Sequence, residues 1–271
     1  MDTDLAKRVF SCIDNTTLNA TDSEASVEAF CRHTLDLSLQ WKAESGDHSD
    51  SGSSLSTLHF PLSTCKVAAV CVYPRFVRCA KRVLDGSGIK VASVAGAFPH
   101  GQLPIELKVK EVEYAVEEGA EEVDVVLSRG LMLEGCDDEV RSEVEQMKRA
   151  CQGRTLKVIL ETGELKETSV IARASRLAIE GGADFIKTST GKISVGATLE
   201  AADVMLQVLS DHVKKTKKTV GFKAAGGIRK PEEALAYAHL AQKIMGDEFV
   251  KNQTFRIGAS SLTDSLFSVL T

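Results

Sequence analysis

The stretch LKVILETGELKETSVIARASRLAIEGGADFIKT, residues 156–188, contains two short apolar runs with a helical pattern between them. The runs 156–161 and 183–188 are too short for typical helices and contain β-branched or aromatic side chains, as strands do. Between them, 169–182 repeats apolar residues at three- and four-residue spacing and ends at glycines, as helices commonly do. The stretch therefore predicts a strand–helix–strand unit, the building block of a parallel sheet.

The same alternation runs along the whole chain. Helical patterns cover 106–119, 198–215 with Thr198 as a candidate N-cap, and 230–246 with Pro231 suited to the first turn. Eight strands alternating with helices predict an α/β fold, a TIM (β/α)8 barrel with an extra N-terminal helical segment, in a single domain. The six further strand candidates lie at 9–14, 67–73, 89–95, 121–127, 218–224 and 254–260.

Two points of this architecture have alternatives. An open doubly wound sheet is the rival fold, but it favours a G-x-G-x-x-G loop after its first strand, and the sequence has none. Residues 2–12 also fit a helix that leads into a short first strand. One segment, 43–57, interrupts the alternation and is rich in Ser, Gly and Asp, which predicts a flexible surface loop.

The composition is typical of a globular protein in a reducing compartment. Of the 271 residues, 43% are hydrophobic and 26% charged, and the net charge of −5 argues against a nucleic-acid or anionic-membrane surface. The 7 cysteines are odd in number and form no C-x-x-C pair, which predicts free thiols and a cytoplasmic location. We expect no membrane span, because no apolar run approaches about 18 residues and the N-terminus has no apolar signal region.

Polar residues at the C-terminal ends of the predicted strands are the candidates for catalysis, because that face of a barrel carries its active site. Lys187 and Lys223 follow neighbouring strands, so two ammonium groups would share a partly dry pocket. Each disfavours the charge of the other, which lowers one pKa and supplies a neutral amine for Schiff-base chemistry. Asp124 would complete a proton relay with Lys223 and a water. The plainer interpretation of either lysine alone is a salt bridge.

Glycines and hydroxyl groups near the last strands predict an anion site. Gly226 and Gly227 follow the seventh strand, and Ser260 and Ser261 follow the eighth. These two loops commonly bind phosphate in barrels through backbone N–H groups and a helix N-terminus. Metal catalysis has little support, because the 6 histidines are scattered and no pair has the spacing of helical ligands.

With these residues identified, the sequence resembles the deoxyribose-phosphate aldolases, a family of class I, Schiff-base aldolases with a TIM-barrel fold. The resemblance extends from about Asp14 to Leu266, which is nearly the whole chain. Its blocks are IDNTTLN (13–19), VCVYPRF (70–76), FPHG (98–101), EEVDVV (121–126), KVILETGEL (157–165), ADFIKTSTGK (183–192), VGFKAAGGIR (220–229) and FRIGASSL (255–262).

The resemblance implies an enzyme of deoxyribonucleotide catabolism that needs no cofactor or metal. It would cleave 2-deoxy-D-ribose 5-phosphate to D-glyceraldehyde 3-phosphate and acetaldehyde. Lys187 would be the Schiff-base lysine, Lys223 the lysine that lowers its pKa, and Asp124 the relay carboxylate. Substrate binding would involve Asp14, Thr16, Cys71 and Lys192, and phosphate binding Gly191, Gly226, Gly227, Ser260 and Ser261.

Two departures from the family pattern keep other functions open. Residues 43–57 are longer than in compact members, and many members end in a tyrosine that assists proton transfer, whereas this sequence ends in SVLT. The only tyrosines are Tyr73, Tyr114 and Tyr237, which predicts reduced turnover. The alternative is therefore an aldolase-like barrel with weak or no turnover that serves as a binding or scaffold protein. An aldolase for another phosphorylated sugar is a third hypothesis, and a homodimer is an assembly state that the sequence leaves open.

Overall fold

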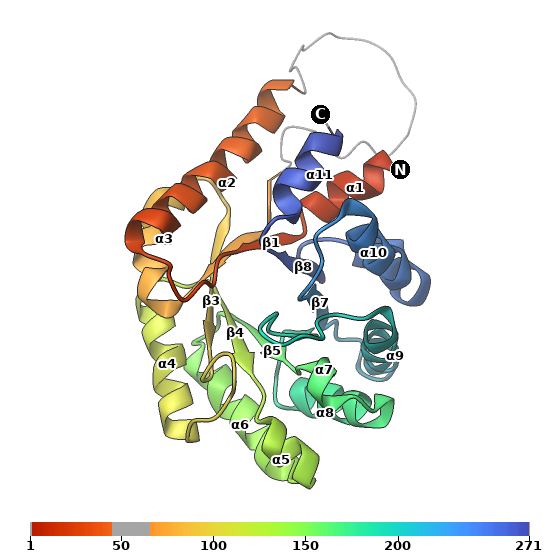
Figure 1. Cartoon of the computed structure of the whole chain (residues 1–271). Coiled ribbons are helices and arrows are strands. Elements are labelled where there is room, and N and C mark those ends of the chain that lie inside the picture. The colour runs from red at the N-terminus through yellow and green to blue at the C-terminus, as the bar shows by residue number, and fades with distance from the viewer. Residues whose placement is uncertain (1, 45–65, 271) are drawn as a thin grey trace.

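The structure, a computed structural model, describes residues 2–44 and 66–270, apart from the side chains of 39–44. Eight parallel strands pair in chain order and close into a barrel through β1 and β8 (Figure 1). The predicted TIM (β/α)8 barrel is therefore confirmed. The strands are β1 (Ile13–Thr16), β2 (Ala69–Val72), β3 (Lys90–Ala95), β4 (Glu122–Val126), β5 (Thr155–Ile159), β6 (Phe185–Lys187), β7 (Gly221–Ala225) and β8 (Phe255–Ala259).

Helices surround the barrel (Figure 1). The helical periodicity correctly predicts α4 (Ile105–Glu117), α8 (Thr168–Glu180), α9 (Leu199–Thr216) and α10 (Pro231–Met245). Thr198 caps α9 as expected, because its hydroxyl oxygen accepts a hydrogen bond from Ala201 N at 3.1 Å, and Pro231 lies in the first turn of α10. The helices are α1 (Thr3–Phe10), α2 (Glu24–Glu44), α3 (Val77–Leu84), α4 (Ile105–Glu117), α5 (Arg129–Glu134), α6 (Asp137–Ala150), α7 (Thr162–Leu165), α8 (Thr168–Glu180), α9 (Leu199–Thr216), α10 (Pro231–Met245) and α11 (Leu262–Leu270), with short 3-10 helices η2 (Pro74–Phe76) and η3 (Asp247–Phe249).

The first predicted strand begins too early in the sequence. Val9 and Phe10 belong to α1, and β1 starts only at Ile13. Asp2 caps α1 by accepting a hydrogen bond from Leu5 N at 3.1 Å, and the apolar side of the helix is buried. The apolar residues at its end therefore pack as one face of a helix, so the interpretation of this segment as a helix leading into a short strand is correct.

Three further expectations concern the loop 43–57, the cysteines and the possibility of a membrane span. The predicted loop 43–57 lies almost entirely outside the described residues, and its first two residues belong to α2. The described cysteines are all free thiols, while Cys65 lies outside the described segments. None of the described helices combines the length and the apolar composition that a membrane crossing requires.

The strands separate two buried regions, one between the barrel and the helices and one inside the barrel. Apolar side chains such as Val70, Val123 and Val158 are fully buried in the core that packs between barrel and helices. Inside the barrel, small apolar residues from β2 and β3 pack together, among them Ala69 and Ala92. The remaining strands contribute charged side chains to the same interior, and these define the candidate active site.

Candidate active site

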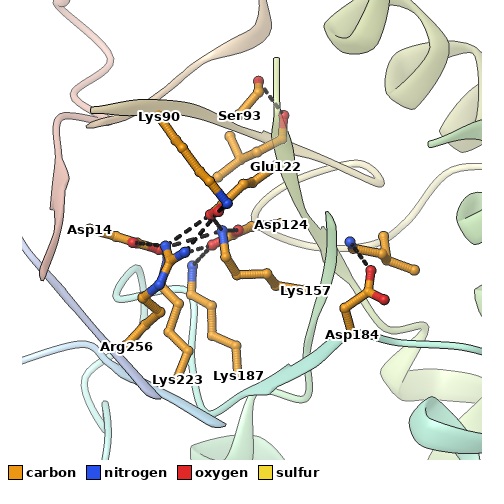
Figure 2. A network of polar contacts seen from close by, with 12 residues as sticks. Asp14, Lys90, Ser93, Glu122, Asp124, Lys157, Asp184, Lys187, Lys223 and Arg256 are labelled. Atoms are coloured by element: carbon orange, nitrogen blue, oxygen red, sulfur yellow. Dashed lines mark hydrogen bonds and ion pairs between the residues drawn. The ribbon is translucent and has the colours of Figure 1, made fainter. Parts of the chain in front are cut away.

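Lys187 and Lys223 meet inside the barrel. They occupy paired positions of β6 and β7, and both side chains are buried. Lys187 Nζ donates a hydrogen bond to Asp124 Oδ2 at 2.8 Å, and Lys223 Nζ donates to the same oxygen at 2.7 Å (Figure 2). The two amines therefore converge on one carboxylate, as the order of the strands predicts.

The two lysines have opposite electrostatic environments. Burial lowers the pKa of Lys187 below that of an ordinary lysine, and the charge of Lys223 lowers it further against the opposing effect of Asp124. Burial also lowers the pKa of Lys223, but the carboxylates of Asp124 and Asp14 outweigh burial and raise that pKa above its usual value. Lys187 is thus the amine suited to act as a nucleophile. Burial contributes more to this than the neighbouring lysine, which was the cause expected from the sequence.

Asp124 contacts three ammonium groups at once. Its second oxygen, Oδ1, accepts a hydrogen bond from Lys157 Nζ at 2.8 Å. Burial by itself raises the pKa of Asp124, but the charges of Lys157, Lys187 and Lys223 hold that pKa well below its usual range. A carboxylate that bridges one amine of lowered pKa and one of raised pKa is placed to move protons between them.

Asp14 belongs to the charged network inside the barrel. Its side chain is fully buried, Oδ2 accepts from Lys223 Nζ at 2.5 Å, and Oδ1 accepts from Arg256 Nη1 at 2.5 Å. Thr16 donates its hydroxyl to the Asp14 carbonyl at 2.8 Å and is paired across the sheet with Cys71. Burial raises the pKa of the Cys71 thiol to about 11, so this residue is a packed thiol.

Three charged residues of this network are missing from the sequence prediction. They are Glu122, Lys157 and Arg256, and all three side chains are buried. Arg256 donates to the two oxygens of Glu122 at 2.8 and 2.9 Å, and Lys157 Nζ contacts Glu122 Oε2 at 2.6 Å. Lys157 and Arg256 each lie within a largely apolar strand run, and Glu122 lies two residues before Asp124 on the same strand. A charged residue within a buried strand was the signal that could have identified them.

The charged site also lies deeper in the barrel than the ends of the strands. Lys187 is the last residue of β6, but Asp124 and Lys223 lie in the middle of β4 and β7. Residues two apart on a strand face the same side, so Glu122 and Asp124 both point inward. The amine of Lys187 therefore belongs to the last residue of its strand and reaches the charged side chains inside the barrel.

Glycine backbones converge next to the charged network. A Cβ at Gly226 would lie 3.1 Å from Gly196 Cα and 3.3 Å from Gly191 Cα, and Ala197 N donates to the Gly226 carbonyl at 3.0 Å. Gly226 and Gly227 have φ of 93° and 86°, a region that favours glycine. Such backbones leave N–H groups open to a close-lying anion.

The other predicted phosphate ligands lie on neighbouring loops. Ser260 and Ser261 are exposed between β8 and the N-terminus of α11, next to the loop that follows β7. Lys192 is exposed as well, and its Nζ donates a hydrogen bond to the Leu18 carbonyl. The structure therefore gathers all five predicted phosphate residues at the C-terminal ends of β6, β7 and β8.

A further buried carboxylate, that of Glu161, fixes the loop after β6. Glu161 accepts hydrogen bonds from Thr190 N at 3.2 Å and Thr190 Oγ1 at 2.5 Å, and burial raises its pKa. Arg129 lies 3.7 Å from Glu161 and donates to the carbonyls of Pro99 and His100 at 3.1 and 3.0 Å. Arg129, which the sequence prediction omits, thereby ties together the loops after β3, β4 and β5. His100 contributes only its backbone to these bonds.

The buried carboxylates face cations and not one another. Within residues 2–44 and 66–270, no group of three or more His, Cys, Asp or Glu side chains is arranged to hold a metal ion.

Comparison with known proteins identifies related folds. The family model for DeoC/LacD family aldolases matches residues 50–266. The solved structure of the aldolase QR15 is 30% identical, with a TM-score of 0.73, and the match covers 97% of this chain and 96% of that one. A crystal structure from Coccidioides immitis, described as a putative deoxyribose-phosphate aldolase, is 24% identical, with a TM-score of 0.77 and coverage of 98% and 87%. The deoxyribose phosphate aldolase from Aeropyrum pernix, described as a unique tetramer, is 23% identical, with a TM-score of 0.70 and coverage of 99% and 98%.

Proposed function

Because the chain belongs to the DeoC/LacD family of aldolases, we propose that it cleaves 2-deoxy-D-ribose 5-phosphate to D-glyceraldehyde 3-phosphate and acetaldehyde. The reaction proceeds through a Schiff base on Lys187, and residues 1–271 act as one aldolase domain. One observation carries this proposal: the buried amine of Lys187, whose pKa is lowered, contacts Asp124 beside the charged Lys223. A neutral lysine in a dry site is the nucleophile that imine chemistry requires.

The catalytic steps follow from these contacts. Lys187 Nζ attacks the C1 aldehyde of the open-chain sugar, and loss of water gives a protonated imine. Asp124 then accepts the proton of the C3 hydroxyl through a water. The charged ammonium group of Lys223 keeps Asp124 in place by donating a hydrogen bond to it. The C2–C3 bond breaks, its electron pair forms an enamine with the imine, and glyceraldehyde 3-phosphate departs. Protonation at C2 and hydrolysis release acetaldehyde and restore the amine.

The glycine loops supply the phosphate site in this proposal. Backbone N–H groups of Gly191, Gly226 and Gly227 and the N-terminus of α11 at Ser260 and Ser261 face the phosphate group. The positive φ angles at the three glycines support this assignment, because they leave the backbone unobstructed. Lys192 adds a positive charge at the same rim. Asp14 supports Lys223, while Thr16 and Cys71 border the substrate from β1 and β2.

Trapping with sodium borohydride tests the nucleophile directly. The protein is incubated with acetaldehyde, reduced and mapped by peptide mass spectrometry. An added mass of an ethyl group at Lys187 is expected. Lys187→Leu should lose the adduct, while Lys108→Leu, which removes an equally buried lysine that contacts Glu143 outside the barrel, should keep it. Reduction without any adduct at Lys187 would contradict the proposal.

A coupled assay for glyceraldehyde 3-phosphate then tests the substrate. Release of this product from 2-deoxyribose 5-phosphate is the expected result. An adduct at Lys187 without turnover would favour the aldolase-like binding protein. Turnover with a different phosphorylated sugar, but not with deoxyribose 5-phosphate, would favour an aldolase of other specificity.

A further inference from the structure

The barrel interior next to Lys187 contains a single connected set of charged side chains. Figure 2 shows them pointing toward one another from β1 and from β4 to β8. None of these side chains is more than 4% exposed. The carboxylates are Asp14, Glu122 and Asp124, and the cations are Lys157, Lys187, Lys223 and Arg256.

The remaining strands add no further buried charge to this set. From β2, Cys71 faces the lysines, and burial raises the pKa of its thiol to about 11, so it is uncharged at neutral pH. From β3, the Ser93 hydroxyl donates to backbone carbonyls only. Lys90 contacts Glu122 Oε1 at 3.0 Å, but its side chain is 48% exposed, so water solvates its charge. Within the described residues, the buried balance is therefore three carboxylates against four basic groups.

If all seven groups were ionised, the buried interior would carry one positive charge more than the carboxylates balance. Such a charge is costly, so one basic group loses its proton. The guanidinium of Arg256 does not lose it. Lys157 lies within 3.5 Å of all three carboxylates, Lys223 contacts two, and Lys187 contacts only Asp124. Lys187, with the fewest carboxylate partners, is therefore the group that becomes neutral.

We propose that Glu122 and Arg256 are positioning residues for the aldol reaction, which act by setting the interior charge balance that leaves Lys187 as the uncharged amine. Neither residue contacts Lys187. Arg256 and Glu122 form an ion pair with each other, and Arg256 also contacts Asp14 while Glu122 also contacts Lys157. Arg256 is also fixed by its guanidinium lying 5.5 Å from the centre of the Phe185 ring. This inference rests on the proposed role of Lys187 as nucleophile.

The charge balance predicts opposite effects for the two partners. Arg256→Met removes a cation, so the three carboxylates retain the proton on Lys187 and its amine becomes neutral only at higher pH. Glu122→Gln removes a carboxylate and lets Lys187 become neutral at lower pH. For a unit charge about 10 Å away at an effective dielectric constant of about 20, each shift is roughly one pH unit. Arg256→Lys keeps the positive charge, and the double variant Arg256→Met with Glu122→Gln loses one charge of each sign. In both, the pH at which Lys187 becomes neutral should stay within about 0.3 pH units of the wild-type value.

Trace reductive methylation with formaldehyde and cyanoborohydride measures the neutral fraction of Lys187 without relying on turnover. Labelling of Lys187 is followed against pH by peptide mass mapping, with the exposed Lys218 as internal reference and circular dichroism as the test of folding. Shifts of opposite sign in Arg256→Met and Glu122→Gln support the proposal. Shifts of the same sign, no shift, or an equal shift in Arg256→Lys and Arg256→Met would overturn it.

The design remains decisive if one variant does not fold. If Arg256→Met does not fold, the labelling of Lys187 in Glu122→Gln must move to lower pH. If Glu122→Gln does not fold, the labelling in Arg256→Met must move to higher pH than in Arg256→Lys. Failure of the wild type to cleave deoxyribose 5-phosphate would reject the proposed substrate, whereas the labelling profiles would still report whether the ion pair controls Lys187.

Discussion

Loss of the Lys223 charge should raise the pH at which Lys187 reacts by about two units. Lys223→Leu removes an ammonium group that shares Asp124 Oδ2 with Lys187. It also removes one of the three cations that surround Asp14, which leaves more negative charge near Lys187. Both changes favour the protonated form of Lys187, so they act in the same direction.

The magnitude follows from the geometry of the shared oxygen. Two nitrogens at 2.8 and 2.7 Å from one oxygen lie within about 5.5 Å of each other. At about 5 Å and an effective dielectric constant of about 20, Coulomb's law gives about 3 kcal/mol, or roughly two pKa units. Removing one partner of buried ion pairs also destabilises the fold, by about 3–5 kcal/mol.

Borohydride trapping with acetaldehyde across a pH series measures this shift. The adduct at Lys187 should reach half of its maximum about two pH units higher in Lys223→Leu than in the wild type. Lys108→Leu is the matched control, because it removes a fully buried lysine that contacts Glu143 on the outside of the barrel. A profile of Lys223→Leu that matches this control, or that moves to lower pH, would refute the coupling between the two lysines.

Other substitutions test separate parts of the site. Lys187→Leu should abolish the acetaldehyde adduct and leave the thermal unfolding temperature within a few degrees of the wild type, because burial lowers the pKa of the lost amine and its ion pair is with the single carboxylate of Asp124. Gly226→Ala should raise KM for the phosphorylated sugar about tenfold without changing acetaldehyde trapping, since the added methyl group would lie 3.1 Å from Gly196 Cα. Although burial raises the pKa of Glu122, Lys157 and Arg256 lower it to about 2, below its ordinary value of 4.5. Its stabilising contribution is therefore complete above about pH 4.5 and lost as the pH falls toward 2. Urea unfolding at pH 6 and pH 3 should show a smaller loss of stability in Glu122→Gln than in the wild type.

The chain order of strands and helices could be predicted because its signals are local. Apolar runs of strand length alternate with three- and four-residue spacing, and each pattern is read within a window of one element. The predicted start of the first strand was wrong for a physical reason. A short apolar run at Val9 and Phe10 fits a strand or the end of a helix equally well, and the burial of the apolar face of α1 decides between them.

The sequence by itself determined the barrel, the pairing of Lys187 with Lys223 and the loops that carry the glycines, because neighbouring strands of a parallel barrel follow one another in the chain. Only the tertiary structure decided which charges face one another across the interior. Asp14 and Arg256 are 242 residues apart and meet because β1 closes the barrel against β8. Burial, which contributes most to the low pKa of Lys187, likewise exists only once the strands enclose the amine, because desolvation is a property of the surrounding atoms and not of the residue.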